Sequence, residues 1–294
     1  MGKPVVGLAL GSGGARGWCH IGVLRELAAM GIEAQVIAGS SMGALVGAVH
    51  AAGRLDALED WARGLTLGGM LPLIDMRIAG GGLVGGEGIL TMLRGLGLPP
   101  GIEDLALPFL AVATDLRTGR EVWLKRGDLV GAVRASVSIP GLLRPQRVEG
   151  RWLIDGGVVN PVPVSAARAL GAEVVIAVNP NGATLAGYWE PGVAAPVFPD
   201  LGALLPEKLR ALWSKGAEAD PAAEPSYLAL VNAAIDIMSD HILRSRLAGE
   251  PPQVLMGAQL GGVAVVDFHR AAECIDEGRR MVQAQAAAIS AAVG

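Results

Sequence analysis

The chain has 294 residues, of which 51% are hydrophobic and 18% charged, and its formal net charge is −4. This composition is typical of a folded globular protein and excludes an intrinsically disordered chain. The negative charge argues against nucleic-acid binding, because proteins of that class usually carry a basic surface. Two cysteines, Cys19 and Cys274, are too few for a disulfide framework or a zinc site.

No segment of the sequence has the pattern of a signal peptide or of a membrane-spanning helix. The first apolar run, residues 5–10, is too short and too interrupted by glycine for a signal peptide. The longest candidate for a spanning helix, residues 162–178, is broken by Arg168 and Glu173 and falls short of the ~20 apolar residues required. We therefore expect a cytoplasmic protein whose contact with the inner face of a membrane is at most peripheral.

The N-terminal part of the chain alternates strands and helices. An apolar strand over residues 5–10 precedes a glycine-rich loop at 11–17 and a helix that stops at Gly31. A second strand ends at Ala38, and a sharp turn at residues 39–43 leads into a helix of small residues. This order predicts an α/β fold, and the continuous apolar runs predict a parallel sheet that is buried on both faces.

The rest of the chain continues this pattern before becoming helical. Residues 107–114 predict a strand that pairs with residues 121–124 across a turn at 118–119, and Asp128 is expected to cap a helix that ends near Ser136. Residues 65–90 follow no regular period. The remaining predicted elements are strands over 152–154 and 174–178, a helix over 165–170, a short helix over 207–213 within a Pro-, Ala- and Gly-rich stretch at 182–225, and long helices over 227–247 and 273–293.

The sequence Gly39-x-Ser41-x-Gly43 has the spacing of a nucleophile elbow. In such a turn the chain leaves a strand and enters a helix, and one strained residue presents its hydroxyl above the sheet. The two glycines let neighbouring backbone approach without a Cβ clash. Taken alone, the motif is also compatible with a tight turn that has no chemistry. Its position between an apolar strand and a helix favours Ser41 as a nucleophile.

Residues 11–17, Gly-Ser-Gly-Gly-Ala-Arg-Gly, form a second glycine-rich turn between a strand and a helix. Amides in such a loop attract an anion, and the helix dipole adds to the attraction. A phosphate-binding loop is the alternative, but position 16 lacks the third glycine of a dinucleotide fingerprint and no Gly-Lys-Ser/Thr follows. We therefore expect an oxyanion hole formed by Gly11, Gly13, Gly14, Ala15 and Arg16.

Asp155 ends a predicted strand and is followed by two glycines, a pattern that is often only a turn. To act as a base for Ser41, its carboxylate needs a raised pKa, which burial near Ile154 and Trp152 is expected to supply. It must also lie within ~3 Å of the serine hydroxyl.

These three motifs, in this order, resemble those of the patatin-like phospholipase family. Residues 136–141 resemble a further family segment that lines the active site, and residues 244–252 resemble the small bacterial RssA-type members in particular. The resemblance implies a modified α/β-hydrolase fold, with a central, mostly parallel sheet flanked by helices and a helical C-terminal extension. It places the catalytic domain at residues 5–180. It makes residues 181–294 a loop or cover region and C-terminal helices packed on the same domain.

The implied activity is hydrolysis of fatty-acyl esters, either phospholipids or lysophospholipids, through an acyl-enzyme. The family resemblance assigns Ser41 as nucleophile and Asp155 as base in a dyad, with no cofactor and no metal. A Ser-Asp-His triad is the alternative, since His241 and His269 follow Asp155, although neither has a flanking motif. His20 and His50 lie one turn into the helices after the two loops, and we assign them no role.

Two other interpretations come from different classes of protein. One is a regulatory or adaptor protein with weak esterase or thioesterase activity, against which the intact Ser41 and Asp155 argue. The other is a nucleotide-binding module, which the absent glycine and lysine disfavour.

Access to lipid is a separate hypothesis. Eight large apolar residues follow the elbow helix within a glycine-containing stretch: Trp61, Leu65, Leu67, Met70, Leu71, Leu73, Ile74 and Met76. Such runs usually pack in a core, but they also suit a flap that admits acyl chains and touches a bilayer. Residues 182–225, with Trp189 and Phe198, are the opposite lip in this hypothesis.

Overall fold

The computed structural model describes residues 3–66, 68, 82–84, 86–182 and 227–294. Within them, eight strands form one sheet in the order β10-β9-β1-β2-β4-β8-β7, with β5 paired to β4, and β3 and β6 form a small second sheet. The strands are β1 (Val6–Leu10), β2 (Val36–Ser40), β3 (Gly82–Val84), β4 (Phe109–Asp115), β5 (Glu121–Leu124), β6 (Gly141–Leu143), β7 (Gln146–Val148), β8 (Arg151–Asp155), β9 (Val174–Asn179) and β10 (Val254–Gly257).

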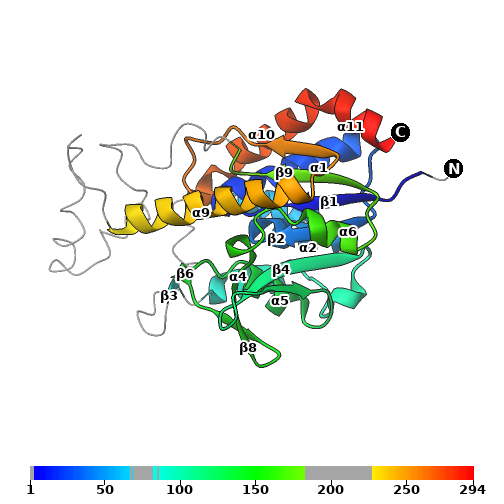
Figure 1. Ribbon diagram of the computed structural model, residues 1–294. Helices are drawn as coiled ribbons and strands as arrows, with labels where there is room; N and C mark the ends of the chain where they lie inside the picture. Colours follow the sequence, from blue (N-terminus) through cyan, green and yellow to red (C-terminus); the bar gives the residue numbers. More distant parts are fainter. Residues whose placement is uncertain (1–2, 67, 69–81, 85, 183–226) are drawn as a thin grey trace, which may run out of the picture.

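The helices described in the same ranges connect and cover these strands (Figure 1). They are α1 (Cys19–Ala29), α2 (Met42–Ala51), α3 (Leu55–Arg63), α4 (Glu87–Gly95), α5 (Leu129–Ser136), α6 (Val164–Ala169), α9 (Tyr227–Gly249), α10 (Ala271–Ala284) and α11 (Ala286–Val293). Short 3-10 turns follow β1 and β8, namely η1 (Gly14–Trp18) and η4 (Gly156–Val158), and η6 (Phe268–Arg270) precedes α10.

The main sheet is parallel from β10 through β9, β1 and β2 to β4, and β5, β8 and β7 add to it in antiparallel orientation. Strands β1, β2 and β4 are buried along their whole length, which explains why they read as continuous apolar runs. The structure thus confirms the predicted α/β class with its mostly parallel sheet.

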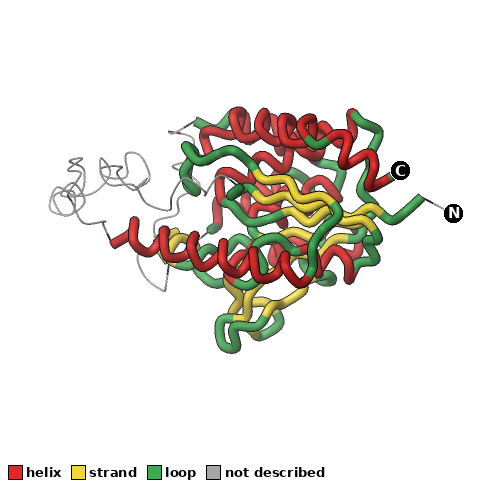
Figure 2. The backbone as a smooth tube through the Cα atoms, turned by 45° about the horizontal axis from the view of Figure 1, so that its top comes forward, coloured by secondary structure: helices red, strands yellow, loops and turns green. Residues whose placement is uncertain are grey.

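Alternate residues of the central strands enter two separate cores. Leu8, Ile37 and Phe109 pack with residues of α1, α2 and α10 on one face. Ala9 and Val112 pack with α6 and with Leu243 of α9 on the other. Figure 2 shows the strands between these two layers of helices. The carboxyl ends of β1, β2 and β4 therefore form one edge, where the loops that follow β1 and β2 meet.

Several predicted elements appear as expected, and others differ. The strand pair at 107–114 and 121–124 is confirmed as β4 and β5, and the Asp128 carboxylate caps α5 by accepting from the amide of Gly131 at 3.1 Å. The single helix predicted over 273–293 is wrong: α10 begins at Ala271, and Gln285, with φ −115° and ψ 14°, separates it from α11.

Further elements were not predicted: α3, β3, β6 and β7, together with β10 and α4. Strand β10 extends the sheet beyond β9, and α4 begins at Glu87 inside a stretch that was expected to be irregular. The helix predicted over 207–213 lies outside the described residues. None of the described helices has the length and apolar character needed to cross a bilayer.

The flap hypothesis is partly corrected. Leu65 belongs to the main core, and Trp61 packs against that core with its ring 6.1 Å from the ring of Trp18, centroid to centroid. The other flap residues, at 67 and 70–76, lie outside the described part of the chain, as do Trp189 and Phe198 of the expected opposite lip.

Candidate active site

Ser41 occupies a strained turn between β2 and α2. Its φ of 55° and ψ of −123° lie in a region that side-chain-bearing residues rarely adopt. The flanking glycines are sterically required: a Cβ at Gly39 would lie 2.4 Å from the Cα of Ala44, and one at Gly43 would lie 2.0 Å from the carbonyl oxygen of Leu10. The turn therefore has the geometry that the elbow motif predicts.

A hydroxyl from outside this turn holds its backbone. The amide of Ser41 donates to Oγ of Ser136 at 2.9 Å, and that hydroxyl donates in turn to the carbonyl of Val112 at 2.6 Å. Ser136 ends α5, so the segment 136–141 contacts the site, as its sequence suggested. Its role in supporting the turn could not be seen from the motif.

The pairing of β2, β4 and β8 brings Asp155 to Ser41. Ser40 pairs with Val112 of β4, and the next residue of β4, Ala113, pairs with Asp155 of β8. The Ser41 hydroxyl donates to Oδ2 of Asp155 at 2.6 Å. The other carboxylate oxygen, Oδ1, accepts the amide of Gly157 at 2.7 Å, which fixes the orientation of the carboxylate.

Burial makes the carboxyl group of Asp155 a weaker acid than an ordinary aspartate. Desolvation raises the pKa of its carboxyl from the model-compound value of 3.8 to about 7, and the hydrogen bonds from Ser41 and Gly157 oppose that rise. Trp152, which was expected to contribute to this burial, is instead 54% exposed. A carboxylate with a pKa near neutrality is a far better proton acceptor than an ordinary aspartate.

The glycine-rich loop after β1 lies against the backbone that follows Ser41 and the backbone that follows Asp155. A Cβ at Gly157 would approach Ser12 to 2.8 Å, and one at Gly43 would approach the carbonyl oxygen of Gly11 to the same distance. Residues from three separate motifs therefore meet at the carboxyl edge of the sheet.

Most amides of this loop already have protein acceptors. The engaged pairs are Gly11 with Val178 (2.9 Å), Ser12 with Pro161 (2.8 Å), Ala15 with Val265 (2.8 Å) and Arg16 with Gly13 (3.2 Å). Among the described residues, no acceptor receives the amide of Gly13 or of Gly14. These two amides are thus the ones available to an anion.

Arg16 connects the loop to two distant segments. Its Nε donates to the carbonyl of Val263 at 2.7 Å, and its Nη1 donates to Oδ1 of Asn181 at 2.9 Å. Burial lowers the pKa of the guanidinium, while Asp236 of α9 opposes that shift. These contacts favour a role in fixing the loop over direct contact with an anionic head group.

The histidines do not complete a triad. No histidine in the described part of the chain hydrogen-bonds to Ser41 or Asp155. His20 is fully buried, and its Nε2 lies 2.8 Å from the carbonyl oxygen of Gly11. Burial lowers the pKa of His20 to about 4, so the ring is neutral and donates to that carbonyl. The sequence assigns no role to His20, and the structure shows that it supports the glycine-rich loop through the carbonyl of Gly11.

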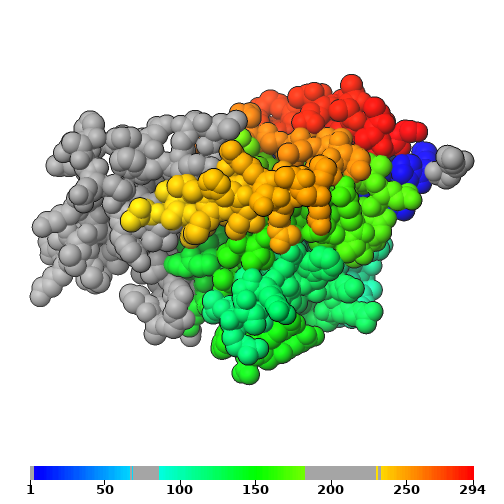
Figure 3. Space-filling model, in the orientation of Figure 1, coloured from blue at the N-terminus to red at the C-terminus, as the bar shows by residue number. Residues whose placement is uncertain are grey.

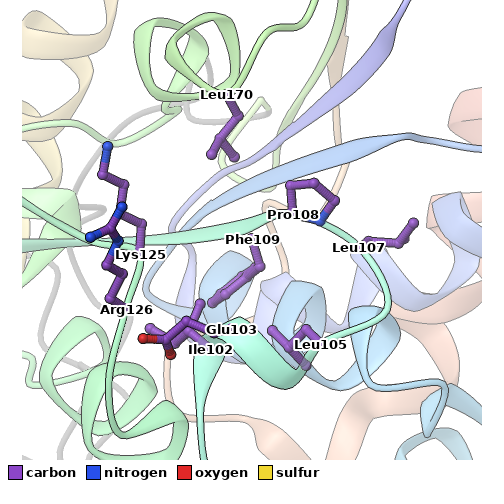
Figure 4. Close-up of a pocket in the computed structure, with 9 residues that line it drawn as sticks. All are labelled: Ile102, Glu103, Leu105, Leu107, Pro108, Phe109, Lys125, Arg126 and Leu170. Atoms are coloured by element: carbon purple, nitrogen blue, oxygen red, sulfur yellow. The ribbon is translucent and has the colours of Figure 1, made fainter.

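A pocket of about 350 Å³ lies at the opposite edge of the sheet. Figure 4 shows Phe109, at the amino end of β4, and Leu170, which follows α6, among its lining residues, with Lys125 and Arg126 at one side. Because Ser41 follows the carboxyl end of β2, this pocket is not part of the candidate active site. Within the described residues, no group of His, Cys, Asp or Glu side chains has the arrangement of a metal site.

The fold and this site define an α/β protein with a serine–aspartate pair at the carboxyl edge of its sheet. Residues 8–168, over half of the chain, match the sequence profile of the family described as patatin-like phospholipase. The chain belongs to this family. The resemblance to RssA-type members in particular stays a prediction.

Relatives of known sequence support the assignment. An uncharacterized NTE family protein of Mycobacterium tuberculosis is 38% identical over 325 residues, which cover 95% of this chain and 90% of that protein. Patatin-like phospholipase domain-containing protein 7 of Mus musculus is 34% identical over 201 residues, or 63% of this chain and 15% of that protein. Among solved structures, VipD from Legionella pneumophila aligns with a TM-score of 0.45 and 12% identity, covering 97% of this chain and 67% of that one.

Proposed function

We propose that the protein is a serine hydrolase that cleaves fatty-acyl esters, with Ser41 as nucleophile and Asp155 as base. The observation that carries this proposal is the 2.6 Å contact between the hydroxyl of Ser41 and Oδ2 of Asp155, whose pKa of about 7 suits proton transfer. Because Gly157 holds Oδ1, the second oxygen is left for the serine.

In the first half of the reaction, Oγ of Ser41 attacks the ester carbonyl and its proton passes to Oδ2 of Asp155. Negative charge develops on the carbonyl oxygen, where the free amides of Gly13 and Gly14 stabilise it. The tetrahedral intermediate then collapses, and Asp155 returns the proton to the departing alcohol. The acyl group remains bound to Ser41 as an ester.

In the second half, Asp155 takes a proton from water while that water attacks the acyl-enzyme. The same two amides hold the second oxyanion. When the intermediate collapses, the proton goes to Oγ of Ser41 and the fatty acid leaves, which restores the enzyme. No step in this sequence requires a histidine or a cofactor.

Membership of the patatin-like phospholipase family and the phospholipase name of a 34% identical mouse relative support a lipid ester as substrate. We infer that the acyl donor is a phospholipid or lysophospholipid. Hydrolysis of p-nitrophenyl butyrate and of lysophosphatidylcholine by the wild type and by Ser41→Ala tests this. The proposal predicts turnover of both substrates by the wild type alone. Equal rates in the two proteins would instead support an adaptor without a working site.

A further inference from the structure

Three large apolar side chains are exposed on the antiparallel side of the main sheet. Leu116 is 53% exposed, Trp123 is 40% exposed and Trp152 is 54% exposed. Leu116 directly follows β4, Trp123 lies in β5 and Trp152 lies in β8. Exposed tryptophans of this kind are uncommon on a surface that faces only water.

The strand register puts these side chains on one face of the sheet. Trp123 pairs with Val112 of β4, and the amide of Leu116 donates to the carbonyl of Trp152 at 2.9 Å. Because side chains alternate along a strand, positions 112 and 116 of the same extended segment project to the same side. Val112 belongs to the core cluster on this face that also includes Leu243 of α9, but the face continues beyond that cluster to Leu116.

Arginines are frequent in the chain segments that carry the exposed tryptophans. Residues 115–124 and 144–152 hold five arginines and three carboxylates, in a chain whose net charge is −4. The guanidinium of Arg147 lies over the ring of Trp152, 6.0 Å from its centroid. Within the described residues, Arg117 and Arg120 form no ion pair, while Glu149 and Glu121 are each paired with an arginine. The surface is therefore both apolar and locally basic.

This surface lies at the edge of the sheet that carries the candidate active site. Ser40 pairs with Val112, so Leu116 is four residues further toward the carboxyl end of β4, or ~13 Å. The β7–β8 hairpin projects at the bottom of Figure 1, away from α9. In Figure 3, which has the same orientation, the yellow and orange atoms of α9 do not reach this hairpin.

We propose that the face formed by Leu116, Trp123, Trp152 and Arg147, together with the exposed Arg117 and Arg120 of the adjoining β4–β5 connection, docks on an anionic phospholipid bilayer. Tryptophan is favoured at the boundary between water and lipid because its ring is apolar and its N–H is polar. Arginines near the bilayer surface gain from the negative potential of anionic lipids. This inference rests on the proposed function, since docking would hold the site edge at the source of its substrate.

Vesicle binding tests the proposal in a Ser41→Ala background, where the lipid stays intact. The vesicles contain either phosphatidylcholine alone or phosphatidylcholine with phosphatidylglycerol. We expect binding to the anionic vesicles that weakens with salt. Leu116→Ser/Trp152→Ser and Arg117→Ala/Arg147→Ala should each reduce binding by about tenfold or more, as lost apolar burial and lost charge require.

Matched controls distinguish binding through this surface from nonspecific binding to vesicles. Leu255→Ser changes a side chain of similar exposure, 40%, on β10 at the other end of the sheet, and Arg54→Ala removes an exposed arginine elsewhere. Both controls should bind like the background protein. Equal binding by the surface variants and the controls would overturn the proposal. So would a dimer in solution that the Trp152 variant disrupts, because the face would then join two copies of the chain.

Activity on a soluble ester distinguishes failure of the docking surface from failure of the proposed function. In the presence of Ser41, the surface variants should hydrolyse p-nitrophenyl butyrate at the wild-type rate and lose activity only on anionic vesicles. A wild type that binds vesicles but cleaves neither substrate would contradict the proposed function and leave docking supported.

Discussion

The amide of Ser41 donates a hydrogen bond to the hydroxyl of Ser136 at 2.9 Å, and both residues are buried. The strained turn that presents the candidate nucleophile is therefore held by a residue of α5, which packs on β4. Because Ser136 also donates to the carbonyl of Val112, its hydroxyl satisfies one donor and one acceptor that water does not reach.

Replacing Ser136 with alanine should leave the amide of Ser41 buried without an acceptor. We expect a loss of about 1 to 3 kcal/mol in the free energy of unfolding and a fall in kcat, measured by urea titration and ester hydrolysis. Ser40→Ala is the matched control, because the Ser40 hydroxyl is buried without a partner in the described part of the chain. It should keep both stability and activity. Equal behaviour of the two variants would show that Ser136 does not support the turn.

Asp155→Asn should keep the shape of the site while removing the proton acceptor. We expect a loss of kcat/KM on the order of 10²-fold or more. In the wild type, kcat/KM should rise with pH and level off above about 7, where the Asp155 carboxyl is ionised. A pH profile that is flat between 5 and 8 would contradict a base with this raised pKa.

Asp155→Asn should lower activity but raise the free energy of unfolding at neutral pH. Because the folded-state pKa of Asp155 is raised above 3.8, the native state binds more protons than the unfolded state between about pH 4 and 7. Wild-type stability contributed by this group therefore falls as pH rises through that window. In Asp155→Asn no buried charge forms as pH rises. The free energy of unfolding of the variant minus that of the wild type should therefore increase by up to about 3 kcal/mol between pH 5 and pH 8. A constant difference would show that Asp155 titrates normally.

Gly14→Ala should damage the anion-binding loop. The φ of Gly14 is +54°, and a Cβ there would lie 2.4 Å from the carbonyl oxygen of Val265. Loss of one donor to an oxyanion typically costs ~3 kcal/mol of barrier, so we expect kcat to fall about 10²-fold while KM changes little. Gly53→Ala is the control, since it has a similar φ of +67° but no atom within 4 Å of a new Cβ. An active Gly14→Ala enzyme would place the oxyanion elsewhere.

Arg16→Lys distinguishes two roles for this arginine. Lysine cannot reproduce its two directed contacts with Val263 and Asn181, so the loop should lose its support. We expect the same fractional loss of kcat on neutral p-nitrophenyl butyrate and on an anionic phospholipid. A loss confined to the anionic substrate would instead assign Arg16 to recognition of the head group.

Much of the site could be predicted because its motifs follow apolar runs. A glycine-containing turn after a buried parallel strand lies at the carboxyl edge of the sheet, so Ser41 and the loop at 11–17 were expected to lie close together. The partners of that loop could not be predicted. The amide of Ala15 donates to the carbonyl of Val265, and the side chain of Arg16 donates to the carbonyl of Val263. Both acceptors are distant in sequence, and because they are backbone groups, no residue type indicates them.

The missed elements have similar physical reasons. Strand β10 has four residues, Val254–Gly257, and so short an apolar run has no period that separates a strand from a loop. Gln285 interrupts a segment rich in alanine, with neither glycine nor proline to indicate the break. The sequence assigns His20 no role, because its contact with the carbonyl of Gly11 depends on the path of the chain between β1 and α1.

Covalent labelling tests the central claim most directly. The wild type would be treated with a fluorophosphonate, digested and mapped by mass spectrometry, beside Ser41→Ala and Asp155→Asn. The account predicts one adduct, on Ser41, which is absent in Ser41→Ala and forms much more slowly in Asp155→Asn. An adduct on Ser40 or Ser12, or ester hydrolysis by a wild type that carries no adduct, would contradict the assignment of Ser41 as the nucleophile.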